Sequence, residues 1–159
     1  MATTARIQHL TERELATWRS FLAASRLLFD ELDRSLTEEV GVSLADYGLL
    51  ARLHEAGEQG LRMSDLADFA VFSRSRISHA VDRLEREGWV ERRSCPTDRR
   101  GSYAALTEAG RAKLSEARPV HHDGIRAHLL SGLSPQQQRA LHEVTDQIRV
   151  SFGAPEARC

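Results

Sequence analysis

Apolar side chains recur every three or four positions over most of this chain, which is the period of an α-helix. In residues 11–42 the apolar stripe is broad and contains Leu15, Trp18, Phe21, Leu22, Leu28, Phe29, Leu32 and Leu36. Thr11 and Glu14 have the spacing of a capping box, and Gly41 is suited to end a helix. The pattern predicts one long helix with more apolar surface than a single chain needs, so we expect it to pack against a second copy.

Three shorter helices are predicted to follow, each opened by a serine whose hydroxyl can accept a bond from a first-turn N–H. The three caps are Ser43, Ser64 and Ser73. Gly57 and Gly60 close the first of these helices and Gly88 closes the last, because glycine accepts the left-handed conformation of a helix end. The second and third helices, separated by a tight turn at residues 71–72, make a helix-turn-helix.

The chain then changes to strands and returns to helix. Residues 89–94 and 102–106 are predicted strands of a hairpin, which would form the wing of a winged helix-turn-helix. Thr107 can cap the next helix, in which Pro119 predicts a kink or a break. Residues 134–137, Ser-Pro-Gln-Gln, place a cap before a proline at the first helical position and a glutamine at the third, which predicts the last helix.

These elements divide the chain into three parts. Residues 11–42 form the predicted N-terminal dimerisation helix, residues 43–106 the winged helix-turn-helix lobe, and residues 107–150 the C-terminal dimerisation helices. The expected fold class is therefore mainly α with a small β-hairpin wing, a winged helix-turn-helix with long dimerisation helices at both ends.

Charge is nearly balanced over the whole chain but unevenly distributed along it. The 159 residues have a formal net charge of -1. Residues 11–60 carry five arginines against ten acids, whereas residues 71–101 carry eight arginines against five acids. A basic segment on an otherwise acidic chain indicates a focused contact with phosphates rather than a non-specific nucleic-acid coat.

A helical wheel of the segment between Ser73 and Gly88 separates a core face from a polar face. The core face holds Ile77, Ala80, Val81 and Leu84. The polar face holds Ser75, His79, Asp82 and Arg86, flanked by Arg76, Ser78 and Arg83. Short hydroxyl side chains allow a helix to lie deep in the major groove of DNA, where an arginine can bind a guanine edge with two hydrogen bonds. The polar face therefore predicts a recognition helix.

Positions early in a recognition helix usually contact the bases. The residues expected to determine sequence preference are therefore Ser75, Arg76 and His79. Two later arginines, Arg83 and Arg86, are expected to contact phosphates or to pair with Asp82 and Glu87.

The hairpin tip is the second predicted DNA-binding element. Residues 95–102 carry two adjacent arginines, Arg99 and Arg100, next to Asp98. A narrow minor groove concentrates negative potential and attracts an inserted arginine, and a carboxylate can orient one guanidinium while the other reaches the groove. The candidate DNA-binding residues of helix and tip are Ser73, Arg74, Ser75, Arg76, Ser78, His79, Arg83, Asp98, Arg99 and Arg100.

The same segments resemble the winged helix of the MarR family of bacterial transcription regulators, over roughly residues 11 to 150. In the helices and the first strand, the resemblance rests on Leu66-Ala67, on residues 81–85 and on Gly88-Trp89-Val90. In the wing it rests on the family signature D-x-R, five residues, L-T-x-x-G, which is matched by Asp98-Arg99-Arg100, Leu106-Thr107 and Gly110. Trp89 stands where the family more often has leucine.

This resemblance implies a homodimer, held by the first helix and the two closing helices, that binds double-stranded DNA at a pseudo-palindromic operator. Two-fold symmetry would place the two recognition helices about 34 Å apart, which is one turn of DNA. The resemblance also implies that Arg100 enters the minor groove. It further implies that a small, often phenolic or aromatic, effector relieves repression by binding between the dimer helices and the DNA-binding lobe.

A candidate effector pocket lies near the junction of the first two predicted helices. Trp18, Arg26, Tyr47 and His54 could line it, and an arginine with aromatic neighbours would suit an aromatic carboxylate or a phenol. The favoured alternative is that Trp18 and Tyr47 are core or dimer-interface residues.

Other reactive residues do not indicate a catalytic or metal site. Cys95 has no second cysteine nearby to resolve an oxidised form, so an inert loop cysteine is favoured over a redox switch. His121, His122 and His128 lack the spacing of three or four that places two metal ligands on one helix face. The sequence has no phosphate loop, no nucleophile elbow and no paired carboxylates with a plausible acid-base role, so we expect neither an enzyme nor a cofactor.

Two cysteines, the absence of an apolar leader and the lack of a long apolar run predict a cytoplasmic protein that does not enter membranes. The alternative to DNA binding is a winged helix used as a protein–protein interaction module. A wing that docks on protein would have little use for two arginines and a glycine at its tip, so the sequence favours DNA.

Overall fold

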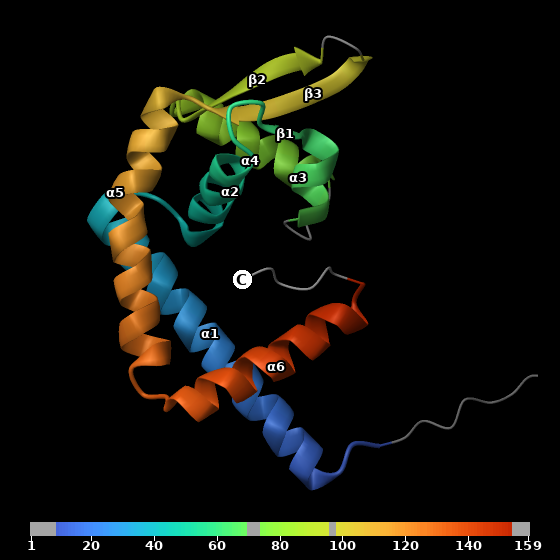
Figure 1. Cartoon of the computed structure of the whole chain (residues 1–159), viewed down its shortest axis with the longest axis vertical. Coiled ribbons are helices and arrows are strands. Elements are labelled where there is room, and N and C mark those ends of the chain that lie inside the picture. Colours follow the sequence, from blue (N-terminus) through green and yellow to red (C-terminus); the bar gives the residue numbers. More distant parts are fainter. Residues whose placement is uncertain (1–8, 70–73, 96–97, 154–159) are drawn as a thin grey trace, which may run out of the picture.

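The computed structural model describes residues 9–69, 74–95 and 98–153 (Figure 1). In chain order its elements are α1 Glu12–Val40, α2 Leu44–Glu55, β1 Leu61–Arg62, α3 Met63–Phe69, α4 Arg74–Arg86, β2 Val90–Cys95, β3 Asp98–Leu106, α5 Glu108–Ile125, the π-helical turn η1 Arg126–Leu130, and α6 Pro135–Ser151. A lobe of α2, α3, α4 and the sheet lies at one end, and α1 and α5 run away from it side by side (Figure 1). The predicted fold class, mainly helical with a small β-wing, is confirmed.

Most of the predicted helix caps form through hydrogen bonds between residues close in the sequence. Four are confirmed by a side chain that accepts from the N–H three residues later: Thr11, Ser43, Thr107 and Ser134. Glu14 and Gln137 complete reciprocal capping boxes at the first and the last helix. The prediction for Ser64 is wrong, because α3 begins directly after β1 and the Ser64 hydroxyl donates to Asp65 from within the helix. The predicted cap Ser73 lies outside the described residues.

The sheet has one strand more than the sequence predicted. Its three antiparallel strands have the order β1-β3-β2, and β1 pairs Leu61 with Ala104 and Arg62 with Tyr103. A strand of two residues is too short to show an alternating pattern. β3 also begins earlier than expected, at Asp98, so residues 98–100 belong to a strand and not to the hairpin loop where they were predicted.

Of the two outcomes predicted at Pro119, the break is wrong, since α5 continues through it to Ile125, and the kink stays a prediction. Burial of Leu114 and Ala117 holds the preceding turn against the core. Gly124 lies so close to α1 that an added Cβ would be 2.6 Å from a methyl carbon of Leu32. Packing on both sides of the proline therefore outweighs its missing N–H. Within the described ranges, each helix is too short or too polar to cross a lipid bilayer.

The hydrophobic core lies where the lobe meets α5 and the C-terminal end of α1. It is formed by Leu36, Val42, Tyr47, Leu49, Leu50, Leu53, Leu66, Ile77, Val81, Leu84, Val90, Ala104, Leu106, Leu114 and Ala117. Three of these, at helical spacing on α4, have no exposed surface: Ile77, Val81 and Leu84. The predicted core face of α4 is confirmed, and its burial decides which side of the helix points outward.

Candidate nucleic-acid interface

The outward face of α4 is polar and accessible in the part that the sequence assigned to base reading. Ser75 and Arg76 are exposed, and 84% of the His79 side chain is accessible. Ser78 is half-buried beside them. Because Ile77 and Val81 anchor the opposite side, these polar side chains project away from the lobe. The arrangement suits a helix that enters a groove.

Other predicted DNA-binding residues are placed through their backbone. Arg74 is the first residue of α4, and Asp98, Arg99 and Arg100 are the first residues of β3. Ser73 lies outside the described residues. The backbone therefore puts these residues at the N-terminal end of the helix and at the outer end of the wing, the two places that groove binding requires.

Arg83 has a different partner from those expected. It donates from Nε to Asp46 Oδ2 (3.2 Å) and from Nη2 to Asp46 Oδ1 (2.5 Å). Asp46 lies in the first turn of α2 and is 7% exposed, and its carboxylate, hydrogen-bonded to the guanidinium, raises the pKa of Arg83 further above its ordinary value. The expected pairing of Arg83 with Asp82 or Glu87 is wrong, because α2 packs next to α4 and offers a buried carboxylate. This two-bond ion pair ties the recognition helix to α2.

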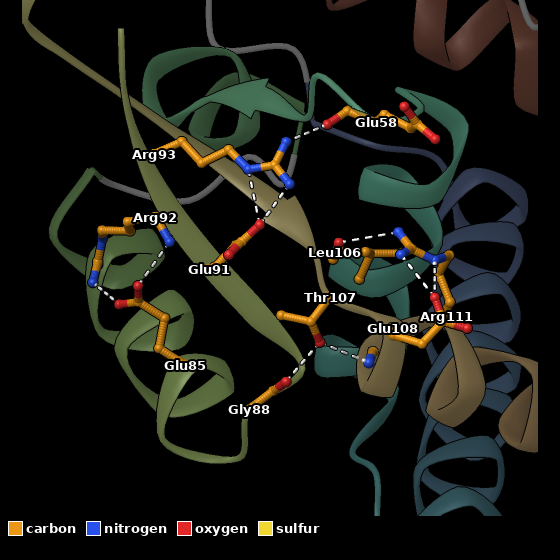
Figure 2. Close-up of polar contacts among 11 residues, drawn as sticks. Glu58, Glu85, Gly88, Glu91, Arg92, Arg93, Leu106, Thr107, Glu108 and Arg111 are labelled. Atoms are coloured by element: carbon orange, nitrogen blue, oxygen red, sulfur yellow. Dashed lines mark hydrogen bonds and ion pairs between the residues drawn. The ribbon is translucent and has the colours of Figure 1, made fainter.

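Arg92 of β2 contacts α4, which the sequence did not predict. Its backbone N–H and its guanidinium both donate to the Glu85 carboxylate (Figure 2). The same guanidinium lies 2.6 Å from Asp82 Oδ1 and donates to the Ser78 carbonyl at 3.2 Å. One side chain of the wing therefore contacts three successive turns of α4.

Further polar contacts lie at the base of the wing. Arg93 donates to Glu91 at 2.5 Å and to the Glu58 carbonyl at 2.6 Å (Figure 2). Arg62 donates to the Tyr103 hydroxyl at 3.0 Å and lies over its ring. Arg93 therefore joins β2 to the turn after α2, and Arg62 joins β1 to β3.

The glycine of the L-T-x-x-G motif has a packing reason. A Cβ at Gly110 would lie 1.9 Å from the Trp89 carbonyl oxygen, which is far inside contact distance. Thr107 draws the two segments together, since its hydroxyl donates to the Gly88 carbonyl at 2.6 Å and accepts from the Gly110 N–H (Figure 2). The motif therefore docks the first turn of α5 on the base of the wing.

Lys113, the only lysine of the chain, was also missed. It donates to the carbonyl of Val40, the last residue of α1, at 3.2 Å and to Glu116 at 2.7 Å. Its ammonium lies 5.6 Å from the ring centroid of Trp89. Its position in the sequence gives no signal of this role, because Val40 is 73 residues away.

One chain does not bring together the four residues of the predicted effector pocket. Tyr47 packs in the core with Leu36, whereas Trp18 precedes Leu36 by about five helical turns, roughly 27 Å along α1. Trp18, Arg26 and His54 are exposed. Tyr47 is therefore confirmed as a core residue, whereas Trp18, 51% exposed, lies outside the core of one chain, and its place in a dimer interface stays a prediction.

Tyr47 instead contacts α5. Its ring centroid lies 4.2 Å from that of His121. Burial lowers the pKa of His121, and the charge of His122 lowers it further. Burial also raises the pKa of Tyr47, an effect that Arg118 opposes. These rings form a joint between the lobe and α5.

The three histidines considered as metal ligands lie in different surroundings. The rings of His121 and His122 are 6.0 Å apart, and His128 faces Glu31 of α1 at 3.7 Å. Across the part of the chain that the structure describes, no three His, Cys, Asp or Glu side chains are grouped as metal ligands would be.

Known proteins show the same sequence pattern and fold. The pattern that defines the MarR family matches residues 40–101. Sco3205, a MarR family transcriptional regulator from Streptomyces coelicolor crystallised in complex with DNA, is 42% identical, with a TM-score of 0.86 over 91% of each chain. AbsC, a MarR family transcriptional regulator from the same organism, is 34% identical, with a TM-score of 0.85 over 91% of this chain and 97% of its own.

A repressor is among the relatives as well. The transcriptional repressor MprA from Escherichia coli K12 is 30% identical over 108 residues, which are 68% of this chain and 61% of MprA. The likeness to Sco3205 and AbsC extends over nearly the whole chain, from the long first helix through the wing to the closing helices. With its winged helix and its wing-to-helix motif, this chain belongs to the MarR family of transcriptional regulators.

Proposed function

We propose that this protein represses transcription by binding a pseudo-palindromic operator in double-stranded DNA as a homodimer. The outer face of α4 carries the proposal, because Ser75, Arg76 and His79 are exposed there, whereas Ile77, Val81 and Leu84 on the opposite face have no exposed surface. Hydroxyl, guanidinium and imidazole groups suit direct reading of base edges in the major groove. Sco3205 was crystallised with DNA and MprA is a named repressor, which supports a DNA-binding role over a protein-docking or catalytic one.

The residue roles follow from position. We assign base reading to Ser75, Arg76 and His79, with contacts at the edge of the groove from Ser73, Arg74 and Ser78. Arg100, oriented with Arg99 by Asp98, would enter the minor groove. Arg83 is left out of this set, since its guanidinium already binds the buried Asp46.

The dimer would be held by α1, α5 and α6, with the lobe of residues 43–106 projecting from it. Large apolar side chains are exposed on the first and last of these helices: Trp18, Phe21, Leu27, Phe29, Val144, Ile148 and Val150. An apolar surface of this extent is typical of a protein–protein interface. Burial against a second copy would give the two-fold axis that sets the recognition helices about 34 Å apart.

A small aromatic or phenolic effector would relieve repression. We place its site beside the Tyr47–His121 joint, because the aromatic rings there lie near Arg118, and a ligand between α2 and α5 could turn the lobe relative to the dimer. Titration of the protein–DNA complex with benzoate or phenol tests this, and release of DNA is the expected result.

DNA binding is tested by fluorescence anisotropy with the promoter DNA of the protein's own gene. We expect a sequence-specific complex that weakens steeply with salt. Arg76→Ala should weaken specific binding by about 5-fold to 150-fold, as expected when a bidentate contact worth roughly 1–3 kcal/mol is lost. Arg19→Ala, an exposed arginine on α1, is the matched control and should change little. Equal binding of the promoter and of unrelated DNA would contradict the proposal.

A further inference from the structure

The proposed reading face of α4 consists of Ser75, Arg76 and His79. The flank of α4 next to it, which faces the wing, is acidic. Asp82 and Glu85 follow Ser78 at intervals of four and three, so all three lie on one stripe of the helix. The Asp82 side chain is 46% exposed, and His79 of the reading face lies 3.9 Å from it. Two free carboxylates at this place would repel the phosphates on either side of a groove.

Arg92 occupies this stripe. Its guanidinium is bound by the carboxylates of Glu85 and Asp82 and by the Ser78 carbonyl, and its own N–H donates to Glu85 at 2.8 Å. Only 29% of its side chain is exposed. A guanidinium bound on these sides has few donors left for a phosphate.

The contacts also fix geometry. Arg92 lies on β2, which pairs along its length with β3, so the strand that carries Arg100 is connected through Arg92 to α4. The hydrogen bond from the Arg92 N–H to Glu85 fixes the position of β2 along the axis of α4. The contact of the Arg92 guanidinium with Asp82 fixes the distance between β2 and α4.

We propose that Arg92 is a positioning residue for DNA recognition: it neutralises Asp82 and Glu85 and locks the wing to α4, without contacting DNA itself. The inference rests on the proposed DNA-binding function. The wild-type protein is therefore measured first, and failure to bind operator DNA would overturn both.

The test compares operator affinity of two neighbouring arginine variants. Arg92→Met should weaken binding at least tenfold. Arg93→Met is the matched control, since it removes the same charge from the next position of β2 but its partners are Glu91 and Glu58 rather than α4. It should change the affinity by less than about threefold, as is usual for surface pairs.

Charge neutralisation is separated from loss of structure by a rescue. Asp82→Asn with Glu85→Gln, added to Arg92→Met, removes the carboxylates that Arg92 had masked and should recover a large part of the lost affinity. A direct phosphate contact gives another result: the triple variant stays weak, and the slope of log affinity against log salt falls by about two units, because each of the two subunits loses one contact. That result, or full affinity of Arg92→Met, would overturn the inference while leaving the proposed function intact.

Locking of the wing is measured on the DNA-free protein. Amide hydrogen exchange of β2 and β3 should become faster in Arg92→Met than in Arg93→Met, and unchanged exchange would overturn this part.

If Arg92→Met does not fold, Arg92→Lys replaces it. Lysine keeps the charge but lacks the planar fork, so it should bind operator with an affinity between wild type and the tenfold loss. Wild-type affinity with lysine would contradict a locking role.

Discussion

The DNA-binding lobe and the helices that carry it bury their apolar residues in opposite ways. In the lobe, side chains from α2, α3, α4 and the strands enclose one another, and several have no exposed surface, among them Leu50, Leu53, Leu66 and Leu84. In α6 none of the described residues is buried. On α1 only Leu32 and Leu36, near the lobe, are buried, while Trp18 and Phe29 are about half exposed, at 51% and 56%.

The contrast shows that one chain buries the core of the DNA-binding lobe but leaves the apolar faces of α1 and α6 exposed. The lobe contains a closed core, so its shape is set within one chain. The helical arms, α1 and α6, have an amphipathic pattern but leave large apolar side chains exposed, among them Trp18, Phe29 and Val144. The four predictions below test that difference, in order of decreasing expected effect.

The largest effect is expected from a cavity in the lobe. Leu84→Ala removes a fully buried side chain from α4 and should lower the free energy of unfolding by about 2–5 kcal/mol. Leu10→Ala removes the same atoms from a side chain that is 55% exposed just before α1, and should lower it by much less. Urea unfolding followed by circular dichroism measures both. Equal losses would contradict the contrast.

Two helical glycines give a paired test of close packing. Alanine normally stabilises a helix relative to glycine by about 0.5–1 kcal/mol. Gly48→Ala in α2, where a Cβ would meet nothing within 4 Å, should show this gain. Gly110→Ala should instead destabilise by about 1–3 kcal/mol, because its Cβ would collide with the Trp89 carbonyl. A thermal melt that rises for both variants would exclude tight docking of α5 on the wing.

The arms are tested through their exposed apolar face. Val144→Glu with Ile148→Glu places two charges on one side of α6 and should shift the protein from dimer to single chain in sedimentation velocity. Gln147→Glu, an exposed polar position of the same helix, should leave the dimer intact. A dimer that persists in the double variant would place the interface elsewhere.

The smallest effect is expected at the joint between lobe and arm. Burial lowers the pKa of His121 below its ordinary value of 6.5, so the unfolded chain binds this proton more readily than the folded one. The contribution of His121 to stability is therefore complete above that ordinary pKa and falls as the pH drops through it. His121→Phe keeps a ring against Tyr47 but cannot be protonated.

Between about pH 7.5 and about pH 5.5, the fall in Tm should be smaller by a few degrees for His121→Phe than for wild type. His142→Gln on α6 is an exposed histidine and serves as the control. An identical pH dependence of wild type and His121→Phe would mean that the joint does not sense protons.

The sequence by itself determined the features that arise within a few residues. Thr11 with Glu14 and Ser134 with Gln137 close hydrogen-bonded rings across one helical turn, so their caps could be read directly. The apolar period of α4 predicted its buried face for the same reason. The capping prediction was wrong at Ser64. β1 pairs with β3 as far as Arg62, so α3 begins at Met63 and Ser64 lies inside the helix.

The tertiary structure decided which distant groups became partners. Asp46 and Arg83 are 37 residues apart, and Val40 and Lys113 are 73 apart, so only packing of the helices brings each pair together. The acids of α4 could be listed from the sequence, yet their neutralisation by Arg92 follows from the angle of the wing. Local hydrogen bonds fix the elements, whereas the burial of apolar surface fixes their arrangement and thereby which arginines are paired with carboxylates.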